Sequence, residues 1–168
     1  NAVNITILSS NLANGSAIGE WGLSVLAVVD DQCVLFDTGR NPDTVIRNAR
    51  ALGVDLSCIS DVVLSHFHFD HTSGLLNIVA AARETNPQAV RRLHVARGFF
   101  LSRRIAKKGD QESNQMIALR TDLEKAGIEI IEHDKPAEIL PAVWISGPVE
   151  RRHDEKNYPS HIQVNLDG

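Results

Sequence analysis

Ser65-His66-Phe67-His68-Phe69-Asp70-His71 is the stretch of sequence that decides the fold, and it follows the apolar run Val62-Val63-Leu64. Its imidazoles and carboxylate are side chains that zinc and neighbouring first-row metals bind well. The first two histidines alternate with the period of an extended chain and can point the same way, while Asp70 and His71 form a second, adjacent pair. The stretch therefore predicts two metal-binding pairs on one loop; the alternative is a surface histidine cluster at the end of a strand.

The length and composition indicate one globular domain. The chain has 168 residues, of which 43% are hydrophobic and 23% are charged, which is enough for one substantial core and too little for two ordinary domains. The net charge of -4 gives no reason to expect nucleic acid as a partner. The short cationic pairs Arg103-Arg104 and Lys107-Lys108 indicate a solvated face.

The sequence also bears on compartment and redox chemistry. No apolar run reaches the length of a membrane span, so we expect no membrane association. We expect a cytoplasmic protein, and an exported form is the alternative because the chain begins at Asn1 rather than Met. Cys33 and Cys58 lack the spacing of a metal knuckle or a redox pair, so we expect both to be small apolar packing residues.

Alternating strand and helix patterns predict the course of the chain. Apolar and β-branched runs indicate strands at 4–9, 23–29, 33–37, 59–64, 92–96, 128–131 and 143–146, with the second and third forming a hairpin. Helical spacing indicates helices from Asn41-Pro42-Asp43 to Gly53, over 75–82 and over 113–126. Irregular or unfinished segments are expected at 97–112, an exposed cationic excursion or lid, at the polar 150–159, and at 162–164.

The strand, helix and strand around residues 33–64 predict a crossover unit with the histidine loop at the C-terminal end of its second strand. The remaining histidines have other expected roles. His94 lies in an apolar strand context, which favours a satisfied edge or core histidine, and His133 lies beside acidic residues and indicates surface charge. His153 and His161 are near the end of the chain, where either can approach a pocket.

Two motifs resemble those of the metallo-β-lactamase superfamily. They are Asp37-Thr38-Gly39 and, after a helix and a strand, the run from His66 to Leu75, with Ser73 where members often carry glycine. The resemblance implies an α/β fold, the metallo-β-lactamase-like αβ/βα sandwich with a two-metal site at one edge. Within the superfamily, segments 22–24, 48–56 and 143–148 look most like the branch of archaeal dihydropterin-synthase-like proteins.

In full-length members the second half of the fold supplies further ligands, namely another histidine for each metal and a bridging carboxylate. The resemblance therefore implies that residues 1–168 are a single domain, made of the first half and part of the second and truncated at the C-terminus. We expect this chain alone to bind metal weakly, or with solvent and foreign groups in the ligand positions that it does not fill. We also expect a homo-oligomer or association with the missing C-terminal half, because half a sandwich leaves one face of its sheet exposed.

The resemblance also implies roles for the loop residues. His66 and His68 hold one metal, and Asp70 and His71 hold the second. Asp70 is the expected catalytic residue as well, orienting or deprotonating the attacking water. Asp37 is expected to accept a hydrogen bond that fixes a ligand imidazole; the alternative is a turn carboxylate at a strand end. The implied cofactor is zinc, two ions in the complete site, with manganese or iron as alternatives.

The implied activity is that of a metal-dependent hydrolase or related synthase, in which a metal-bound hydroxide attacks a small phosphorylated or cyclic metabolite. Cationic residues within 97–108 and 150–152 are available to an anionic small-molecule substrate. Two alternatives stay open. One is a phosphodiesterase or lactonase of the same superfamily, and the other is a non-catalytic, truncated module that binds metal or takes part in assembly.

Overall fold

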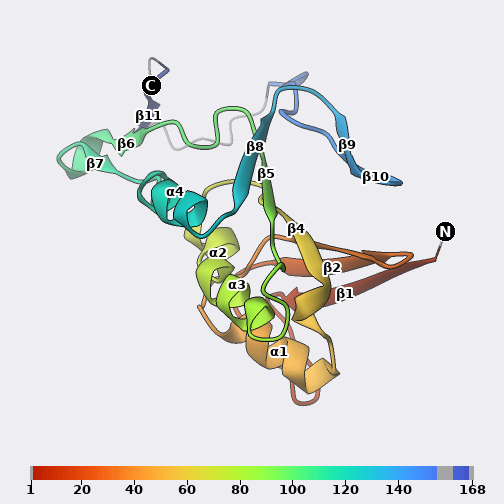
Figure 1. The fold of residues 1–168 in the computed structure, drawn as a ribbon. Helices are drawn as coiled ribbons and strands as arrows, with labels where there is room; N and C mark the ends of the chain where they lie inside the picture. Colours follow the sequence, from red (N-terminus) through yellow and green to blue (C-terminus); the bar gives the residue numbers. More distant parts are fainter. Residues whose placement is uncertain (1, 155–160, 167–168) are drawn as a thin grey trace.

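A mixed sheet forms the centre of the computed structural model, which describes residues 2–154 and 161–166 (Figure 1). Its six strands run in the order β1 (Val3–Ser9), β2 (Ser24–Val29), β3 (Gln32–Phe36), β4 (Ile59–Val63), β5 (Arg92–Ala96) and β8 (Glu129–His133). The first three strands pair antiparallel, whereas β3, β4, β5 and β8 pair in parallel. The strands predicted for these segments are confirmed, apart from small shifts at their ends.

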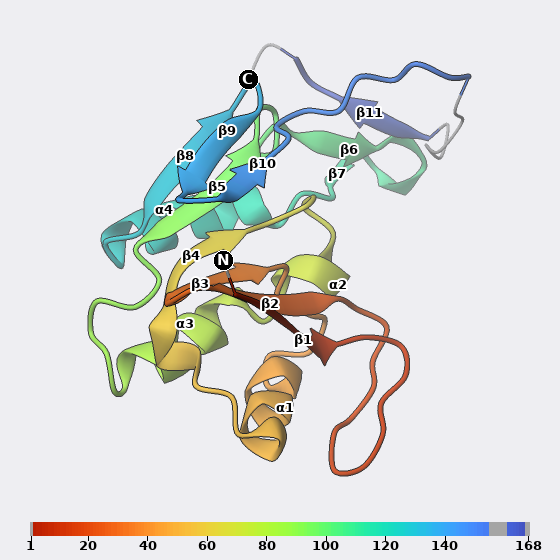
Figure 2. The same cartoon turned by 90° about the vertical axis from the view of Figure 1, so that its right-hand side faces the viewer.

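Helices connect the parallel strands. They are α1 (Thr44–Leu52), α3 (Leu75–Arg83) and α4 (Met116–Lys125), and Figure 2 shows α1 and α3 on one face of the sheet. α1 ends as predicted at Gly53, whose φ of 66° is the left-handed conformation that glycine adopts without strain. Its start differs from the prediction, because Asp43 takes the cap position while Asn41 donates hydrogen bonds to the carboxylate of Glu20.

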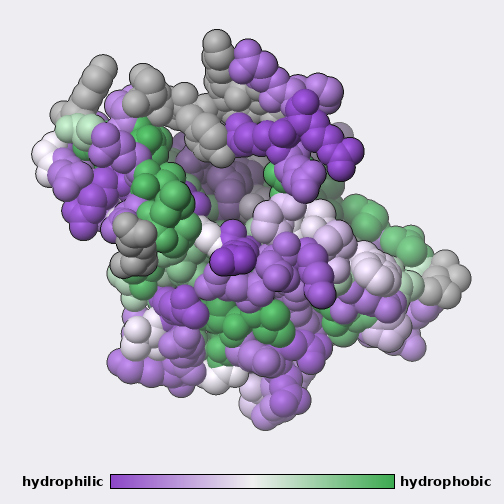
Figure 3. Space-filling view, turned by 90° about the horizontal axis from the view of Figure 1, so that it is seen from above, coloured by the Kyte–Doolittle hydropathy of each residue, from purple (hydrophilic) through white to green (hydrophobic). Residues whose placement is uncertain are grey.

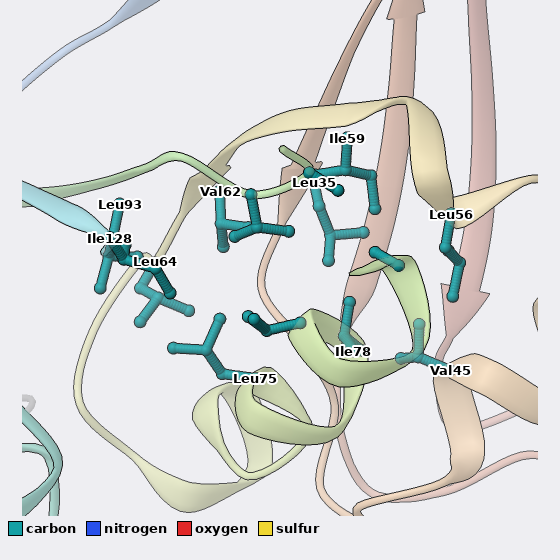
Figure 4. Close-up of a cluster of buried hydrophobic side chains, with 14 of the residues drawn as sticks. Leu35, Val45, Leu56, Ile59, Val62, Leu64, Leu75, Ile78, Leu93 and Ile128 are labelled. Atoms are coloured by element: carbon teal, nitrogen blue, oxygen red, sulfur yellow. The ribbon is translucent and has the colours of Figure 1, made fainter. Parts of the chain in front are cut away.

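The core fills the space between the sheet and these helices (Figure 4). Its central side chains are almost completely inaccessible to solvent: Leu35, Ile59 and Val62 from the strands, Val45 from α1, and Leu75 and Ile78 from α3. Burying one such side chain stabilises the fold by roughly 1.5–3 kcal/mol. The ends of β3 and β4 are therefore fixed relative to each other. The first residues of the loops that follow these two strands are held side by side as a result.

The opposite face of the sheet carries the hairpin of β9 (Ala137–Leu140) and β10 (Val143–Ile145), which Figure 2 shows on the side away from α1. Phe36 and Val63 of the sheet and Trp144 of the hairpin line a cavity of about 660 Å³ between them. Beyond the hairpin, β1 exposes about 60% of the surface of Ile5 and Ile7. Figure 3 shows hydrophobic patches interrupting a largely hydrophilic surface, so part of this face is an uncovered apolar surface.

Residues 97–112 are more ordered than predicted. β6 (Arg103–Ile105) and β7 (Gln111–Glu112) pair antiparallel, the short helix η2 (Ala106–Lys108) joins them, and β11 (Ile162–Val164) pairs with β6. The prediction of an irregular excursion was wrong because the strand that completes this small sheet comes from a distant part of the chain. Of the polar segment predicted at 150–159, residues 155–160 lie outside the described residues.

Cys33 and Cys58 form a disulfide, with 5.6 Å between their Cα atoms. The expectation that they are free packing residues was wrong. Parallel pairing sets Cys33 of β3 opposite Ile59 of β4, so the residue at the end of the short helix η1 (Leu56–Cys58) lies beside Cys33. Within the described residues, no helix is long and apolar enough to cross a bilayer.

A buried polar network crosses β4, β5 and β8. The fully buried carboxylate of Asp61 accepts hydrogen bonds from Arg92 (2.6 and 2.9 Å) and lies 2.7 Å from Nε2 of His94. Nδ1 of His94 lies 3.0 Å from Nε2 of His133. His94 is thus the satisfied core histidine that was predicted, whereas His133 is half-buried and bonded rather than simple surface charge. Burial alone would raise the pKa of Asp61, but hydrogen bonds from His94, Arg92 and Ser60 hold that pKa far below its ordinary range.

Candidate metal centre

The predicted metal-binding residues lie on the loop that follows β4, residues 65–71, which we call the metal loop. Its last residues enter the short helix α2 (Phe69–Thr72), so Asp70 and His71 belong to a helical turn while His68 keeps an extended conformation. The backbone N–H and the side-chain hydroxyl of Thr38 both donate to the carbonyl of His71, at 2.7 and 2.9 Å. The metal loop is therefore docked on the Asp37-Thr38-Gly39 turn that follows β3.

Asp37 lies beneath the metal loop and is fully buried. Its carboxylate accepts hydrogen bonds from the backbone N–H of Ser65 (2.8 Å) and from the Ser65 hydroxyl (2.7 Å), and it lies 2.7 Å from Nδ1 of His71. An ionised carboxylate can only accept, so this contact sets the proton of a neutral His71 on Nδ1. Nε2 of His71 is then the ring nitrogen with a lone pair for a metal.

The imidazoles of the metal loop are close to one another. The ring centroid of His66 lies 4.6 Å from that of His68 and 4.3 Å from that of His71, and Nε2 of His71 lies 3.5 Å from the carboxylate of Asp70. Burial, followed by the neighbouring His71 and His68, lowers the pKa of His66. That shift favours the neutral imidazole, the form in which histidine binds metal.

The donors fit a zinc-type metal in chemistry but do not complete its shell. Across residues 2–154 and 161–166, no three histidine, cysteine, aspartate or glutamate side chains are arranged so that they could hold one ion. A zinc ion in a catalytic site usually has three protein ligands and one water. The metal loop thus brings the four predicted donors near one another, and a full coordination shell requires movement of these side chains or further ligands.

The other histidines of the described chain are not gathered at this site. His94 and His133 are occupied in the network around Asp61. His153 is exposed, and His161 contributes its backbone carbonyl to Ala106. Neither is among the residues that line the two cavities beside the metal loop.

Those two cavities flank Asp70, and each has a volume of about 480 Å³. One is bounded by β6, η2, β7 and the residues before α4, and we call it the Lys108 cavity after the cation in its wall. The other is bounded by the loop between β1 and β2, where Leu12 is 88% and Trp21 is 66% exposed. A small molecule in either cavity would contact the metal loop.

Sequence reasoning missed the arginines that cover the two phenylalanines of the metal loop. The guanidinium of Arg103 stands 4.7 Å from the ring centroid of Phe67, and that of Arg40 stands 5.1 Å from the centroid of Phe69. Such cation–π contacts stabilise by roughly 0.5–2 kcal/mol. It also missed Glu20, whose carboxylate accepts from the backbone of Arg40 and Asn41 and so fixes the turn after β3. No local pattern in the sequence signals these contacts.

Comparisons with known proteins agree with this fold. Two proteins of Methanocaldococcus jannaschii are each 28% identical to the chain. One is 7,8-dihydropterin-6-methyl-4-(beta-D-ribofuranosyl)-aminobenzene-5'-phosphate synthase, and the match covers 78% of this chain and 45% of that protein. The other is an uncharacterised protein, and the match covers 89% of this chain and 55% of that protein. Tm1679, described as a metal-dependent hydrolase of the beta-lactamase superfamily, superposes with a TM-score of 0.65 at 24% identity, over 99% of this chain and 56% of its own. YhfI from Bacillus subtilis gives 0.54 at 14% identity, over 83% and 50%.

The chain spans about half the length of the curated relatives that it matches. The superpositions confirm the predicted α/β fold of the metallo-β-lactamase type. The sequence pattern of the Metallo-beta-lactamase superfamily matches residues 22–155, which is most of the chain. This match includes Asp37 and the whole metal loop. The chain therefore belongs to the metallo-β-lactamase superfamily.

Proposed function

We propose that this chain supplies the metal-binding half of the active site of a metal-dependent hydrolase or related synthase. The observation that carries the proposal is the contact of the buried Asp37 carboxylate with both Ser65 and His71. A surface histidine cluster would have no need of a fully buried carboxylate that fixes one of its rings. The metallo-β-lactamase family to which the chain belongs is hydrolase-like and typically depends on metal.

In the proposed site, His66 and His68 hold one zinc ion, and Asp70 and His71 hold a second, with manganese or iron as alternatives. When bound, such ions lower the pKa of water towards neutrality and polarise a carbonyl or phosphoryl oxygen. Asp37 keeps the proton of His71 on Nδ1 and leaves Nε2 facing Asp70. We assign Asp70 as the proton acceptor for the attacking water, and its place in the lining of both cavities beside the metal loop supports this role.

The proposed substrate is a small phosphorylated or cyclic metabolite. Two cavities of about 480 Å³ match the size of sites that bind small molecules. The archaeal relative at 28% identity is named as the synthase of a 5'-phosphate, which supports a phosphorylated compound. The uncovered apolar face of β1 supports the further proposal that this polypeptide associates with a second copy or with additional protein that covers that face.

A non-catalytic metal-binding module is the second candidate. One observation favours it: the described residues contain no group of three donors that could hold an ion. In that case, the four donors would bind metal weakly and without turnover. The two candidates differ in whether Asp70 is needed for a reaction, and this can be measured.

The experiment compares the wild-type chain with His66→Ala, Asp70→Ala and the matched control Asn77→Ala, which changes an exposed residue of α3. Metal content after dialysis and hydrolysis of phosphoester and lactone substrates are measured with added zinc, manganese or iron. We expect weak metal retention and slow turnover that both substitutions at the metal loop abolish. Turnover that survives Asp70→Ala would remove Asp70 from the mechanism, and metal retention without any turnover would favour the binding module.

A further inference from the structure

The Lys108 cavity lies between two walls that belong to different parts of the fold. One wall is the metal loop, which contributes Phe67, Phe69 and the donors His68 and Asp70. The other wall consists of residues from β6, η2, β7, the turn before α4, and β11. The cavity therefore joins the candidate metal centre to the small sheet that the sequence did not predict.

Arg103 holds the two walls at a fixed separation. Its guanidinium stacks on Phe67 of the metal loop at 4.7 Å and donates hydrogen bonds to the carbonyls of Gly98, Phe99 and Leu101. Its backbone N–H donates to the carboxylate of Glu112 on β7. One residue thus links the metal loop, the chain after β5 and the small sheet, so the cavity exists before any ligand enters.

Some charged groups around this cavity have hydrogen-bond or ion-pair partners within the described part of the protein, and others do not. Glu112 accepts from the Ser102 hydroxyl and from the backbone N–H groups of Arg103 and Asn114; burial would raise its pKa, but these hydrogen bonds lower it. Arg104 pairs with Asp110. By contrast, Lys108 makes no ion pair with the part of the chain that the structure describes. Within the same residues, the side-chain amides of Gln111 and Gln115 make no hydrogen bond. The wall opposite the metal loop thus offers a ligand one ammonium and two amides.

The remaining lining is apolar, with Phe67 and Phe69 on one side and Ile105 and Ile162 on the other. A ring or short chain in the cavity would bury apolar surface against these side chains, and the amides can donate to or accept from its heteroatoms. A lysine ammonium is a compact charge that attracts a phosphate or carboxylate. A single cation does not favour a polyanion, because Asp70 and Glu112 line the same cavity.

We propose that the Lys108 cavity binds the body of an organic substrate that carries one acidic group, and that Lys108 is the residue that recognises this group. The acidic group lies at Lys108 and the apolar body lies between Phe67 and Ile105. The opposite end of the molecule then reaches His68 and Asp70. This assignment of the reacting end rests on the function proposed above, whereas the binding itself does not.

The test measures binding without added metal and without turnover. The 15N-labelled chain is titrated with three compounds that share one ring system: naphthyl phosphate, naphthylacetate and the neutral naphthalenemethanol. Each titration is repeated with Lys108→Met and with the control Lys125→Met, which removes an exposed lysine of α4. The phosphate and the carboxylate distinguish the two sources of the acidic group.

We expect backbone amide signals of residues 105–115 to shift with all three compounds. Lys108→Met should weaken binding of at least one anion roughly threefold to fivefold, the upper part of the range for a solvent-exposed charge pair, and change binding of the neutral compound less than twofold. Lys125→Met should leave binding of both the anions and the neutral compound unchanged. An equal effect of Lys108→Met on neutral and charged compounds, or shifts confined to the sheet face under β9 and β10, would overturn the proposal. Failure of the chain to hydrolyse anything would contradict the proposed function and leave this binding result intact.

Discussion

Replacing Asp37 with asparagine tests whether this residue orients the metal loop. The substitution keeps the volume of a fully buried side chain but exchanges one acceptor oxygen for an NH2 donor. In one orientation the NH2 group faces the Ser65 backbone N–H, which can only donate. In the other it faces the Ser65 hydroxyl and Nδ1 of His71, and that nitrogen can accept only if the imidazole moves its proton to Nε2, the nitrogen that would bind metal. At least one hydrogen bond to a charged group is lost, which typically costs about 1.5–3 kcal/mol.

Two measurements separate the structural from the metal-binding consequence. Urea unfolding should show a free energy of unfolding lowered by about 1.5–3 kcal/mol. Competition with a chromophoric chelator should show zinc affinity reduced by about 10–100-fold, the usual effect of removing a carboxylate that fixes a ligand histidine. The control Asp122→Asn removes an exposed carboxylate from α4 and should leave both quantities unchanged. Zinc affinity within twofold of the wild type would refute the orienting role, even if stability fell.

Three further substitutions or treatments have defined outcomes. In Gly74→Ala, the new Cβ would lie well inside contact distance of the Thr38 carbonyl oxygen. The free energy of unfolding should therefore fall by about 1–3 kcal/mol. A variant as stable as the control Asn77→Ala would contradict this packing. Asp61→Asn should change acid unfolding. The pKa of Asp61 is lower in the folded than in the unfolded chain, so its contribution to the free energy of unfolding is present above about pH 4 and is lost as the pH falls further. Below about pH 4 the free energy of unfolding of the variant should therefore depend less steeply on pH. Reducing the disulfide, which closes a separation of 25 residues, should lower the free energy of unfolding by about 3.5 kcal/mol, and a Cys33→Ala, Cys58→Ala double variant should not respond to reductant.

Much of the central sheet could be predicted from local patterns. β5 has the bounds predicted from the sequence, residues 92–96, and α1 ends at the glycine that can adopt a left-handed conformation. The spacing of His66, His68, Asp70 and His71 identified the superfamily, because few other structures need those donors directly after a buried strand. The role of Asp37 was implied by the resemblance to the superfamily, and in the structure its carboxylate contacts Ser65 and His71.

The sequence by itself determined the elements whose signals lie within a few residues of one another: the parallel strands, the crossover helices and the donor loop. Only the tertiary structure decided which distant residues meet. It brings Cys33 to Cys58, β6 to β11, Asp61 to His94 and His133, and the arginines onto Phe67 and Phe69. The physical reason is that hydrogen bonds, disulfides and ring contacts form between surfaces that only strand register and helix packing bring together, and no local periodicity encodes that register.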